Sequence, residues 1–433
     1  MKFPRVFLKS KEENDIKQGS PWVFDNEVAF VKYTKDGKNL QFQLQDELAS
    51  SCVKNGMPVE LYSKGGLFLG TGIINLRSKI VVRLLGKCRP EDIFGNDANA
   101  ENFETLHTDF SQKFFLNRLQ DALDARFIFF NKSDSYRLVF GEADFIPGFI
   151  VDRYFDKDGR VFLSVQFLSL ASEIFRKELI SAMRSLCHPF GIYERSDVSV
   201  RELEGLEQKK GWIGAEHNPV IIIKENGVLL SVDLENGQKT GYFLDQKNNR
   251  KIVASLAKGK RVLDTFTHTG AFGLNAFIGG ASKVISVDIS PEAIATVETN
   301  IGFNKANHVM KAVCADVFDL LREYEESGEK FDMIILDPPA FAKSSSKVDK
   351  AYGGYKEINL RAMKLLEPGG ILVSCSCSHF FDSIRFYDML MHAASDAKRS
   401  IQIFHKLGAG PDHPILSGYS KSEYLKCAIM RVM

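Results

Sequence analysis

Short apolar runs separated by turn residues mark the first 85 residues of the chain. The runs cover residues 22–24, 40–44, 59–62, 67–69 and 80–85. Turn sequences lie between them, such as those at residues 35–37 and 54–56. Several short strands at this spacing predict a small β-barrel over residues 1–85.

Residues 90–225 mix strand and helix patterns. A helix capped by Asp109 and a second helix over residues 171–186 alternate with strands at 136–140, 148–152 and 161–166. This mixture predicts an α+β middle domain. Beyond it, Asn236-Gly237 lies between two strand-like runs and predicts a hairpin turn, because both residue types accept positive φ.

From about residue 245, apolar strands alternate with helical segments. Strands are predicted at 261–264, 283–288, 311–316, 331–337 and 370–374. Ser290 and Pro291 predict one helix start, since Ser caps helices and Pro suits the first helical position. The alternation predicts a doubly wound, mostly parallel sheet of the Rossmann-like α/β class, with ligands at the carboxyl ends of its strands. We therefore divide the chain into the barrel (1–85), the middle domain (90–225) and a hairpin with the α/β domain (226–433).

Composition narrows the class of protein. With 56 Lys and Arg against 55 Asp and Glu, the chain is no polycation, although residues 1–85 carry 13 basic and 9 acidic residues. No run reaches the roughly 18 apolar residues of a spanning helix, and the first 15 residues lack a signal-peptide core. The seven Cys form no Cys-x-x-Cys pair and no zinc-spaced set with His. We expect a cytoplasmic protein without a metal site or membrane contact.

Acidic residues at successive strand ends predict the cofactor. The loop from Asp264 to Gly270 has one turn glycine where a dinucleotide loop has three, which argues against an NAD or nucleotide-sugar domain. Such a loop suits the amino-acid end of S-adenosylmethionine. Asp288, 24 residues after Asp264, can accept both ribose hydroxyls, and Asp316 can accept the adenine amino group. Any one of these acids alone is as well explained as a helix cap. The predicted cofactor-binding residues are Asp264, Phe266, Thr267, Thr269, Gly270, Asp288, Ile289, Asp316, Val317, Asp337 and Pro338.

Two cysteines follow the fifth strand of this sheet, in the sequence Ser374-Cys375-Ser376-Cys377-Ser378. Residues two apart share a face of a strand, so both thiols can point the same way. A pair of small core cysteines is one interpretation. The other is a thiolate that attacks a pyrimidine ring in the crevice beside Asp337. His379 is either a group that lowers the pKa of this thiol or an ordinary packing residue.

These motifs together resemble the bacterial 23S rRNA 5-methylcytosine methyltransferases that carry an N-terminal PUA domain. The resemblance covers nearly the whole chain. The similar segments are 21–24, 72–75, 78–80 with Arg83, 136–144, 147–148, 151–154, 193–197, 239–246 with Arg250, and the acidic strand ends through Asp337-Pro338-Pro339. Phe145 and Asp25-Asn26 depart from the family pattern at positions that concern packing and RNA contacts.

The resemblance implies a class I methyltransferase domain, S-adenosylmethionine as the cofactor and large-subunit ribosomal RNA as the partner. It implies that Cys377 is the nucleophile and that Cys375 occupies a position where other residues are tolerated. It also implies that Asp337 forms a hydrogen bond with the edge of the cytosine. The residues expected at the RNA are Pro339, Phe341, Arg77, Lys79 and Arg83. For each of the basic ones, a solvated charged rim is an equal alternative.

Two other functions stay open. A related enzyme that methylates a base nitrogen needs no thiol, so the presence of Cys377 argues against it. A non-catalytic PUA protein that only binds RNA does not need the acids at the strand ends. The sequence leaves the modified nucleotide open, and also whether naked RNA or a ribosomal particle is the substrate. A homodimer is one of the oligomeric states it allows.

Overall fold

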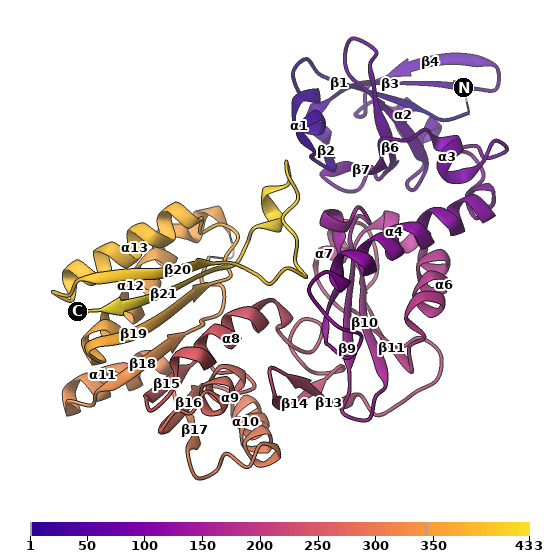
Figure 1. Cartoon of the computed structure of the whole chain (residues 1–433). Coiled ribbons are helices and arrows are strands. Elements are labelled where there is room, and N and C mark those ends of the chain that lie inside the picture. Colours follow the sequence, from indigo (N-terminus) through magenta and orange to yellow (C-terminus); the bar gives the residue numbers. More distant parts are fainter. Residues whose placement is uncertain (1, 343) are drawn as a thin grey trace. The chain divides into compact units, whose positions relative to one another are not determined.

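The chain forms two compact units in the computed structural model, which describes residues 2–342 and 344–433 (Figure 1). Unit 1 collects Met1–Pro219, Asp233–Tyr242 and Pro411–Ser422. Unit 2 collects Val220–Val232, Phe243–Gly410 and Glu423–Met433. Neither unit is one continuous stretch of chain, and two short segments from the second half of the chain belong to unit 1.

Unit 1 starts with a seven-stranded sheet in the order β2-β7-β6-β5-β1-β3-β4. Its strands are β1 (Arg5–Leu8), β2 (Trp22–Phe24), β3 (Val28–Lys35), β4 (Lys38–Phe42), β5 (Pro58–Tyr62), β6 (Phe68–Ile74) and β7 (Ile80–Gly86). The pairs are antiparallel except β1 with β5, and register shifts in four of them bend the sheet. Strands β1 and β3 were not predicted, whereas the other five lie at or near their predicted places. The short helices α1 (Glu13–Gln18), α2 (Glu47–Cys52) and α3 (Pro90–Phe94) accompany this sheet.

The middle of unit 1 is a five-stranded sheet in the order β12-β11-β10-β9-β8. Its elements are β8 (Tyr136–Phe140), β9 (Phe149–Phe155), β10 (Val161–Phe167), β11 (Gly191–Ser196) and β12 (Lys209–Trp212), with α4 (Asp109–Phe127), α5 (Leu170–Ile174), α6 (Arg176–Cys187) and α7 (Val200–Leu203). Helix α4 is capped by Thr108, whose side chain accepts the Ser111 N–H, and not by Asp109 as predicted. The single helix predicted over 171–186 is two helices, because the backbone turns at Phe175.

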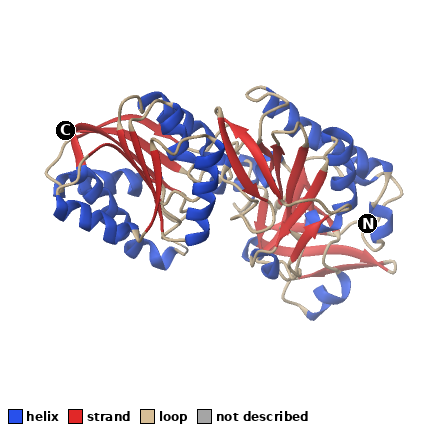
Figure 2. Ribbon diagram, turned by 90° about the horizontal axis from the view of Figure 1, so that it is seen from below, coloured by secondary structure: helices blue, strands red, loops and turns tan. Residues whose placement is uncertain are grey.

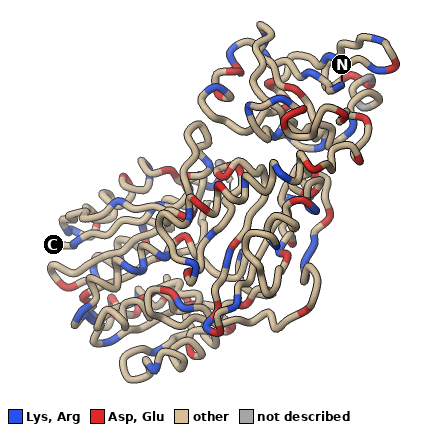
Figure 3. Tube along the Cα trace, turned by 45° about the vertical axis from the view of Figure 1, so that its right-hand side comes forward, with Lys and Arg blue, Asp and Glu red and all other residues tan. Residues whose placement is uncertain are grey.

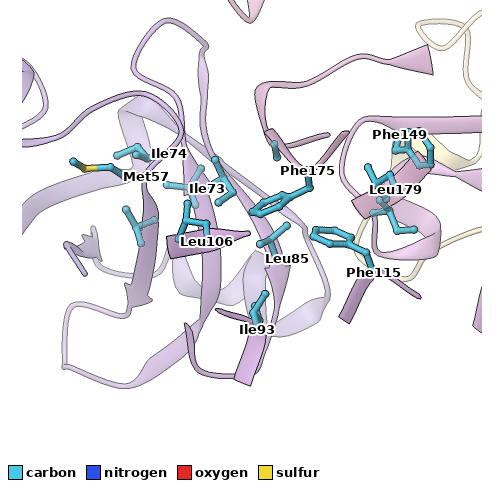
Figure 4. Packing of buried hydrophobic residues seen from close by; sticks show 14 of the residues in the cluster. Met57, Ile73, Ile74, Leu85, Ile93, Leu106, Phe115, Phe149, Phe175 and Leu179 are labelled. Carbon is cyan, nitrogen blue, oxygen red and sulfur yellow. The ribbon is translucent and has the colours of Figure 1, made fainter. Parts of the chain in front are cut away.

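One hydrophobic core joins the two sheets of unit 1. Figure 4 shows Ile73 and Leu85 of the first sheet in the same cluster as Phe115 of α4, Leu179 of α6 and Phe175, which joins α5 to α6. The ring centroid of Phe175 lies 4.8 Å from that of Phe115 and 5.8 Å from that of Phe94. The N-terminal sheet therefore buries part of its apolar surface against the middle region.

Arg83 adds a buried ionic contact between the same two parts of unit 1. Its side chain is 9% exposed, with Nη1 2.8 Å from Glu142 and Nη2 2.9 Å from Glu204. Glu142 also accepts the indole N–H of Trp22 at 2.8 Å. Separation of the first sheet from the middle region would leave these buried charges without compensation. Arg83 therefore stabilises the contact between the two parts.

Unit 2 contains a seven-stranded sheet in the order β17-β16-β15-β18-β19-β21-β20. Its strands are β15 (Arg261–Thr265), β16 (Lys283–Asp288), β17 (Met310–Cys314), β18 (Phe331–Leu336), β19 (Leu366–Ser376), β20 (Ile401–Leu407) and β21 (Lys426–Val432). Strands β15 to β19 are parallel, and β21 runs antiparallel to β19 and β20. The predicted doubly wound, mostly parallel sheet is confirmed.

Helices cover both faces of this sheet (Figures 1 and 2). One group consists of α8 (Lys247–Leu256), α9 (Ala271–Ile278) and α10 (Pro291–Phe303), and the other of α11 (Val317–Ser327), α12 (Val348–Leu365) and α13 (Ser383–Asp396). The second group packs on an apolar core with the inner residues of β18 and β19. The predicted start of α10 is confirmed, since the Ser290 hydroxyl accepts the Ala293 N–H and Pro291 takes the first helical position.

The predicted hairpin turn at Asn236-Gly237 is wrong. The hairpin consists of β13 (Val220–Glu225) and β14 (Val228–Asp233), and its turn is Asn226-Gly227, with φ of 51° and 91°. At Asn236 the backbone N–H instead donates to the carboxylate of Asp233 at 2.9 Å. This local side-chain bond ends β14 in a loop, and within the part of the chain that the structure describes β14 pairs with β13 alone.

Charged residues of both signs are interspersed along both units (Figure 3). In the ranges 2–342 and 344–433, no helix is both long enough and apolar enough to cross a bilayer.

Candidate active site

The strand order of unit 2 reverses between β15 and β18. In α/β sheets, ligands bind in the crevice beyond the carboxyl ends of the strands at such a point. The loop after β15 has an unusual backbone there. Phe266 and His268 have φ of 55° and 53°, and Gly270 has φ of 79°. A positive φ costs a non-glycine residue on the order of 1–3 kcal/mol of conformational free energy, and such backbone strain is concentrated at functional sites.

Asp264 is fully buried at the base of this loop. Its Oδ2 accepts the Gly273 N–H at 2.9 Å and the Ser286 hydroxyl at 3.0 Å, and it also accepts the Thr267 hydroxyl. Burial raises the pKa of Asp264 to about 6, although these hydrogen bonds oppose the rise. Its Oδ1 is buried and has no hydrogen-bond partner among the residues that the structure describes.

This orphaned oxygen tests whether the site fits the expected cofactor. A buried acceptor without a donor costs about 1–3 kcal/mol, so such an atom in a functional loop implies a missing donor. The ammonium group at the amino-acid end of S-adenosylmethionine is a suitable donor. The residues present therefore fit the cofactor that the loop predicts.

Asp288 ends β16 as predicted, whereas β17 ends at Cys314 and Asp316 lies two residues beyond it, at the start of α11. The carboxylate of Asp288 accepts the His268 N–H at 2.9 Å and the Ser290 N–H at 3.1 Å, so it joins the loop after β15 to the start of α10. Asp316 caps α11 through the N–H of Phe318 at 2.7 Å. Between these acids, the side chain of Ile289 is 64% exposed, whereas Val317 is buried. An exposed apolar side chain beside two acids suits one face of an adenine ring.

Asp337 directly follows β18 and is partly buried. Its Oδ1 accepts the side-chain N–H of Gln246 at 3.0 Å. Burial, followed by the negative charge of Asp245, raises the pKa of Asp337 to about 7, against the opposing charge of Arg250. A carboxyl group with this pKa can donate a proton at neutral pH. Pro338 is buried and Pro339 is exposed, while the ring of Phe341 packs 4.6 Å from that of Tyr355.

The two cysteines lie in different surroundings, contrary to the expectation that they share a face toward the crevice. Strand β19 ends at Ser376, so the strand alternation does not extend to Cys377. Cys377 is partly exposed, and its Sγ lies 4.0 Å from the carbonyl oxygen of Pro338. Cys375 is buried opposite Cys427. That thiol and burial raise the pKa of Cys375 well above its usual value, which disfavours a thiolate there.

The basic residues expected at the RNA divide into two kinds. Arg77 and Lys79 are exposed in the turn between β6 and β7. Arg83 is occupied by Glu142 and Glu204, so we do not retain it as a phosphate contact.

Several side chains near the site were missed by the sequence analysis. Asp245 accepts the Tyr424 hydroxyl, and the ring of His379 lies 5.2 Å from that of Tyr424. Lys426 donates to the carbonyl oxygen of Ser378 at 2.7 Å. Asp245 lies in the segment 239–246, whose similarity to the family was the only available signal. Nothing local points to Tyr424 or Lys426, which lie more than 45 residues beyond Cys377.

The chain matches known families over most of its length. Residues 205–426 match the family described as S-adenosylmethionine-dependent methyltransferase. Residues 6–87 match the family described as PUA-like domain. The first match covers the crevice, and the second covers the N-terminal sheet.

Curated relatives and solved structures span the whole chain. The chain is 38% identical over 434 residues to "Ribosomal RNA large subunit methyltransferase I" of Tolumonas auensis, with 99% of each chain covered. The protein of the same name from Photobacterium profundum is 36% identical over 429 residues, with 97% of each covered. A methyltransferase solved in complex with SAH has a TM-score of 0.76 at 23% identity, with 99% of both chains covered. A methyltransferase structure from Streptococcus mutans has a TM-score of 0.74 at 23% identity and the same coverage. These two structures have the same fold as this chain.

Proposed function

Because this chain belongs to the family of S-adenosylmethionine-dependent methyltransferases, we propose that it methylates carbon 5 of a cytosine in large-subunit ribosomal RNA, with Cys377 as the nucleophile. S-adenosylmethionine is the cofactor of the family and supplies a methyl group on a sulfonium. The ribosomal RNA substrate rests on the names of relatives that align over 97–99% of the chain.

The position of Cys377 against the loop after β18 carries this proposal. Its Sγ lies 4.0 Å from the carbonyl oxygen of Pro338, the residue that follows Asp337. Asp337 and Cys377 directly follow the neighbouring parallel strands β18 and β19, in which Leu336 pairs with Ser374. A nucleophile and a proton donor at one crevice are what a covalent attack on a pyrimidine requires.

The chemistry follows from the weak nucleophilicity of carbon 5. The Cys377 thiolate forms a bond to carbon 6, and the electron pair of the double bond moves to carbon 5. Carbon 5 then takes the methyl group, a base removes its proton, and the thiolate leaves to restore the ring. The bond between this methyl group and the sulfonium sulfur breaks as carbon 5 takes the methyl group, and its electron pair stays on sulfur as a neutral thioether. Asp337, with a pKa raised to about 7, donates a hydrogen bond or a proton to the cytosine edge and so stabilises the adduct. The target cytosine must leave the stack of RNA bases to reach the crevice.

The N-terminal sheet offers a second, noncovalent RNA surface, which we call the aromatic face. On it, the ring of Phe7 stacks 4.7 Å from that of Phe30 and 5.3 Å from that of Tyr62. Lys32 lies 5.3 Å from the Phe7 centroid, and Arg89 lies 3.8 Å from the Phe68 centroid. Rings interleaved with cations suit the bases and phosphates of single-stranded RNA. We assign the aromatic face, with the exposed Arg77 and Lys79, to substrate binding.

The proposal is tested by transfer to RNA that lacks the modification. Full-length protein is incubated with methyl-labelled S-adenosylmethionine and 23S rRNA from cells without the gene, and the product is mapped by mass spectrometry of nuclease fragments. We expect one 5-methylcytosine. A methyl group on a ring or exocyclic nitrogen would assign a different reaction to the crevice, and label in no rRNA fragment would refute the substrate.

A further inference from the structure

Lys426, the first residue of β21, is a buried cation without a carboxylate partner. Its residue surface is 4% exposed. Its Nζ donates to the carbonyl oxygens of Ser378 at 2.7 Å and Tyr424 at 2.8 Å. In the described part of the chain, no Asp or Glu oxygen forms a salt bridge with this Nζ. Buried charges in proteins are normally paired with an opposite charge, so this ammonium group requires an anion.

The position of Lys426 identifies that anion. Lys426 is the register partner of Ser376 at the end of β19, and its ammonium group binds the carbonyl of Ser378. Cys377 lies between these two residues. An ammonium group has three N–H donors, of which two are used by carbonyls. We infer that Lys426 is a positioning residue that holds Cys377 in the thiolate form. This inference rests on the proposed role of Cys377.

The electrostatics agree with this geometry. Burial lowers the pKa of Lys426 to about 8, while Cys377 is the foremost of the charges that oppose the fall. At neutral pH the lysine is therefore mostly protonated, and a thiolate at Cys377 makes it more so. By the same coupling, the cation stabilises the thiolate, as cations beside reactive cysteines do.

The other titratable groups near Cys377 and Lys426 come from several neighbouring elements. The phenol of Tyr355 of α12 interacts with Cys377, whereas the carboxylates of Asp382 at the start of α13 and Glu423 before β21 act on Lys426 without forming a salt bridge with it. Asp337 after β18 acts on Cys375, and the ring of His379 packs on that of Tyr424. Asp337, Asp382 and Glu423 are acids, and the Tyr355 phenol has a pKa raised by burial and is neutral. Acids disfavour a thiolate, whereas the cationic Lys426, which interacts with Cys377, favours it.

The test measures the thiolate directly in the full-length protein. Alkylation of Cys377 by iodoacetamide is followed by peptide mass spectrometry from pH 6 to pH 10 in the wild type, Lys426→Gln and Lys426→Arg. Gln keeps an N–H donor for the carbonyls and removes the charge, whereas Arg keeps the charge. We expect Lys426→Gln to react roughly tenfold more slowly at pH 7, with its pH midpoint moved upward by about one unit. Lys426→Arg should restore most of the wild-type profile.

The exposed Cys314 is the internal control, because its alkylation should be the same in all three proteins. An unchanged Cys377 midpoint in Lys426→Gln would overturn the inference, as would equal slowing of methyl transfer at every pH with no change in alkylation. If Lys426→Gln does not bind S-adenosylmethionine, Lys426→Arg provides the test, because it keeps the positive charge. A higher pH midpoint of Cys377 alkylation in Lys426→Arg would then overturn the inference. Alkylation does not require transfer, so a nitrogen-methylated product would refute the proposed function without touching this result.

Discussion

Cys375 lies directly opposite Cys427 in the antiparallel pairing of β19 with β21, and both side chains are buried. The tripeptide of Cys375 thus faces the interior of the sheet, although it repeats the Ser-Cys-Ser pattern that surrounds Cys377. Two residues further along, the chain has left the strand and Cys377 lies at the crevice. The same local sequence therefore yields one packed thiol and one accessible thiol.

Alanine at each cysteine separates these roles. Cys377→Ala should abolish methyl transfer while S-adenosylmethionine still binds. Cys375→Ala should keep substantial activity and lose on the order of 1 kcal/mol of stability, because it removes one buried sulfur from the core. RNA with 5-fluorocytosine at the target should form a covalent adduct with the wild type and Cys375→Ala, detected as a shifted band on denaturing gels. An adduct that persists in Cys377→Ala and vanishes in Cys375→Ala would reverse the assignment.

Asp288→Ala should weaken the binding of S-adenosylmethionine. The substitution removes an acceptor for the ribose hydroxyls and also the bond to the His268 N–H that holds the loop after β15. Hydrogen bonds to charged groups contribute about 1.5–3 kcal/mol, which corresponds to roughly 10- to 150-fold in Kd by calorimetric titration. Asp319→Ala is the matched control, since this acid is exposed in the first turn of α11. Equal affinities in the two variants would mean that the ribose lies elsewhere.

Asp337 should make unit 2 less stable as the pH rises. Its pKa is raised to about 7 in the fold, against about 3.9 in an unfolded chain. The folded state therefore binds this proton more tightly, and its contribution is present at low pH and lost between about pH 4 and pH 7. Asp337→Asn cannot ionise, so its free energy of unfolding, measured by chemical denaturation, should gain on that of the wild type from pH 5 to pH 8, by on the order of 2–4 kcal/mol. The exposed Asp349→Asn should show no such gain, and parallel curves for Asp337→Asn would contradict the burial of this charge.

Substitution by Met should destabilise the protein at Arg83 and leave its stability nearly unchanged at Arg77. Arg83→Met leaves Glu142 and Glu204 buried without their cation and should cost about 3–5 kcal/mol in chemical denaturation. Arg77→Met, on the exposed turn, should change stability by less than about 0.5 kcal/mol. RNA binding should weaken in Arg77→Met if the turn contacts phosphates. A normally stable Arg83→Met would show that the two parts of unit 1 do not depend on this contact.

The aromatic face predicts a change in salt dependence. Lys32→Gln should reduce the slope of log K for RNA against log salt by about one, the amount expected from one lost phosphate contact. Phe30→Ala should weaken binding by about 1–3 kcal/mol at every salt concentration, because it removes a stacking surface. Fluorescence anisotropy with a single-stranded rRNA fragment measures both. The affinity for S-adenosylmethionine should stay constant, and a loss of both ligands together would indicate unfolding.

Strong local patterns predicted much of the fold. The strands of unit 2 were recognisable because they are buried on both faces and so read as continuous apolar runs, most of them ending in an acid. Ser290 and Pro291 specify a helix start by their own chemistry. The predicted hairpin turn was wrong because Asn-Gly occurs twice, at 226–227 and 236–237. At the second pair Asp233 captures the Asn236 N–H, and the backbone does not take the positive φ that Asn226 and Gly227 have.

The sequence by itself determined the class of the α/β sheet and the residues that end its strands at the crevice, since periodicity and strand-end chemistry are local. Tertiary structure alone decided which cysteine is accessible, because that depends on where β19 ends and on Cys427 in another strand. It also decided the roles of Arg83 and Lys426. A charge becomes a structural tie or an electrostatic partner only through groups far away in the chain, here Glu142 and Glu204 for Arg83 and the end of β19 for Lys426. Burial by those distant groups sets the strength of each charge interaction, and no local pattern records it.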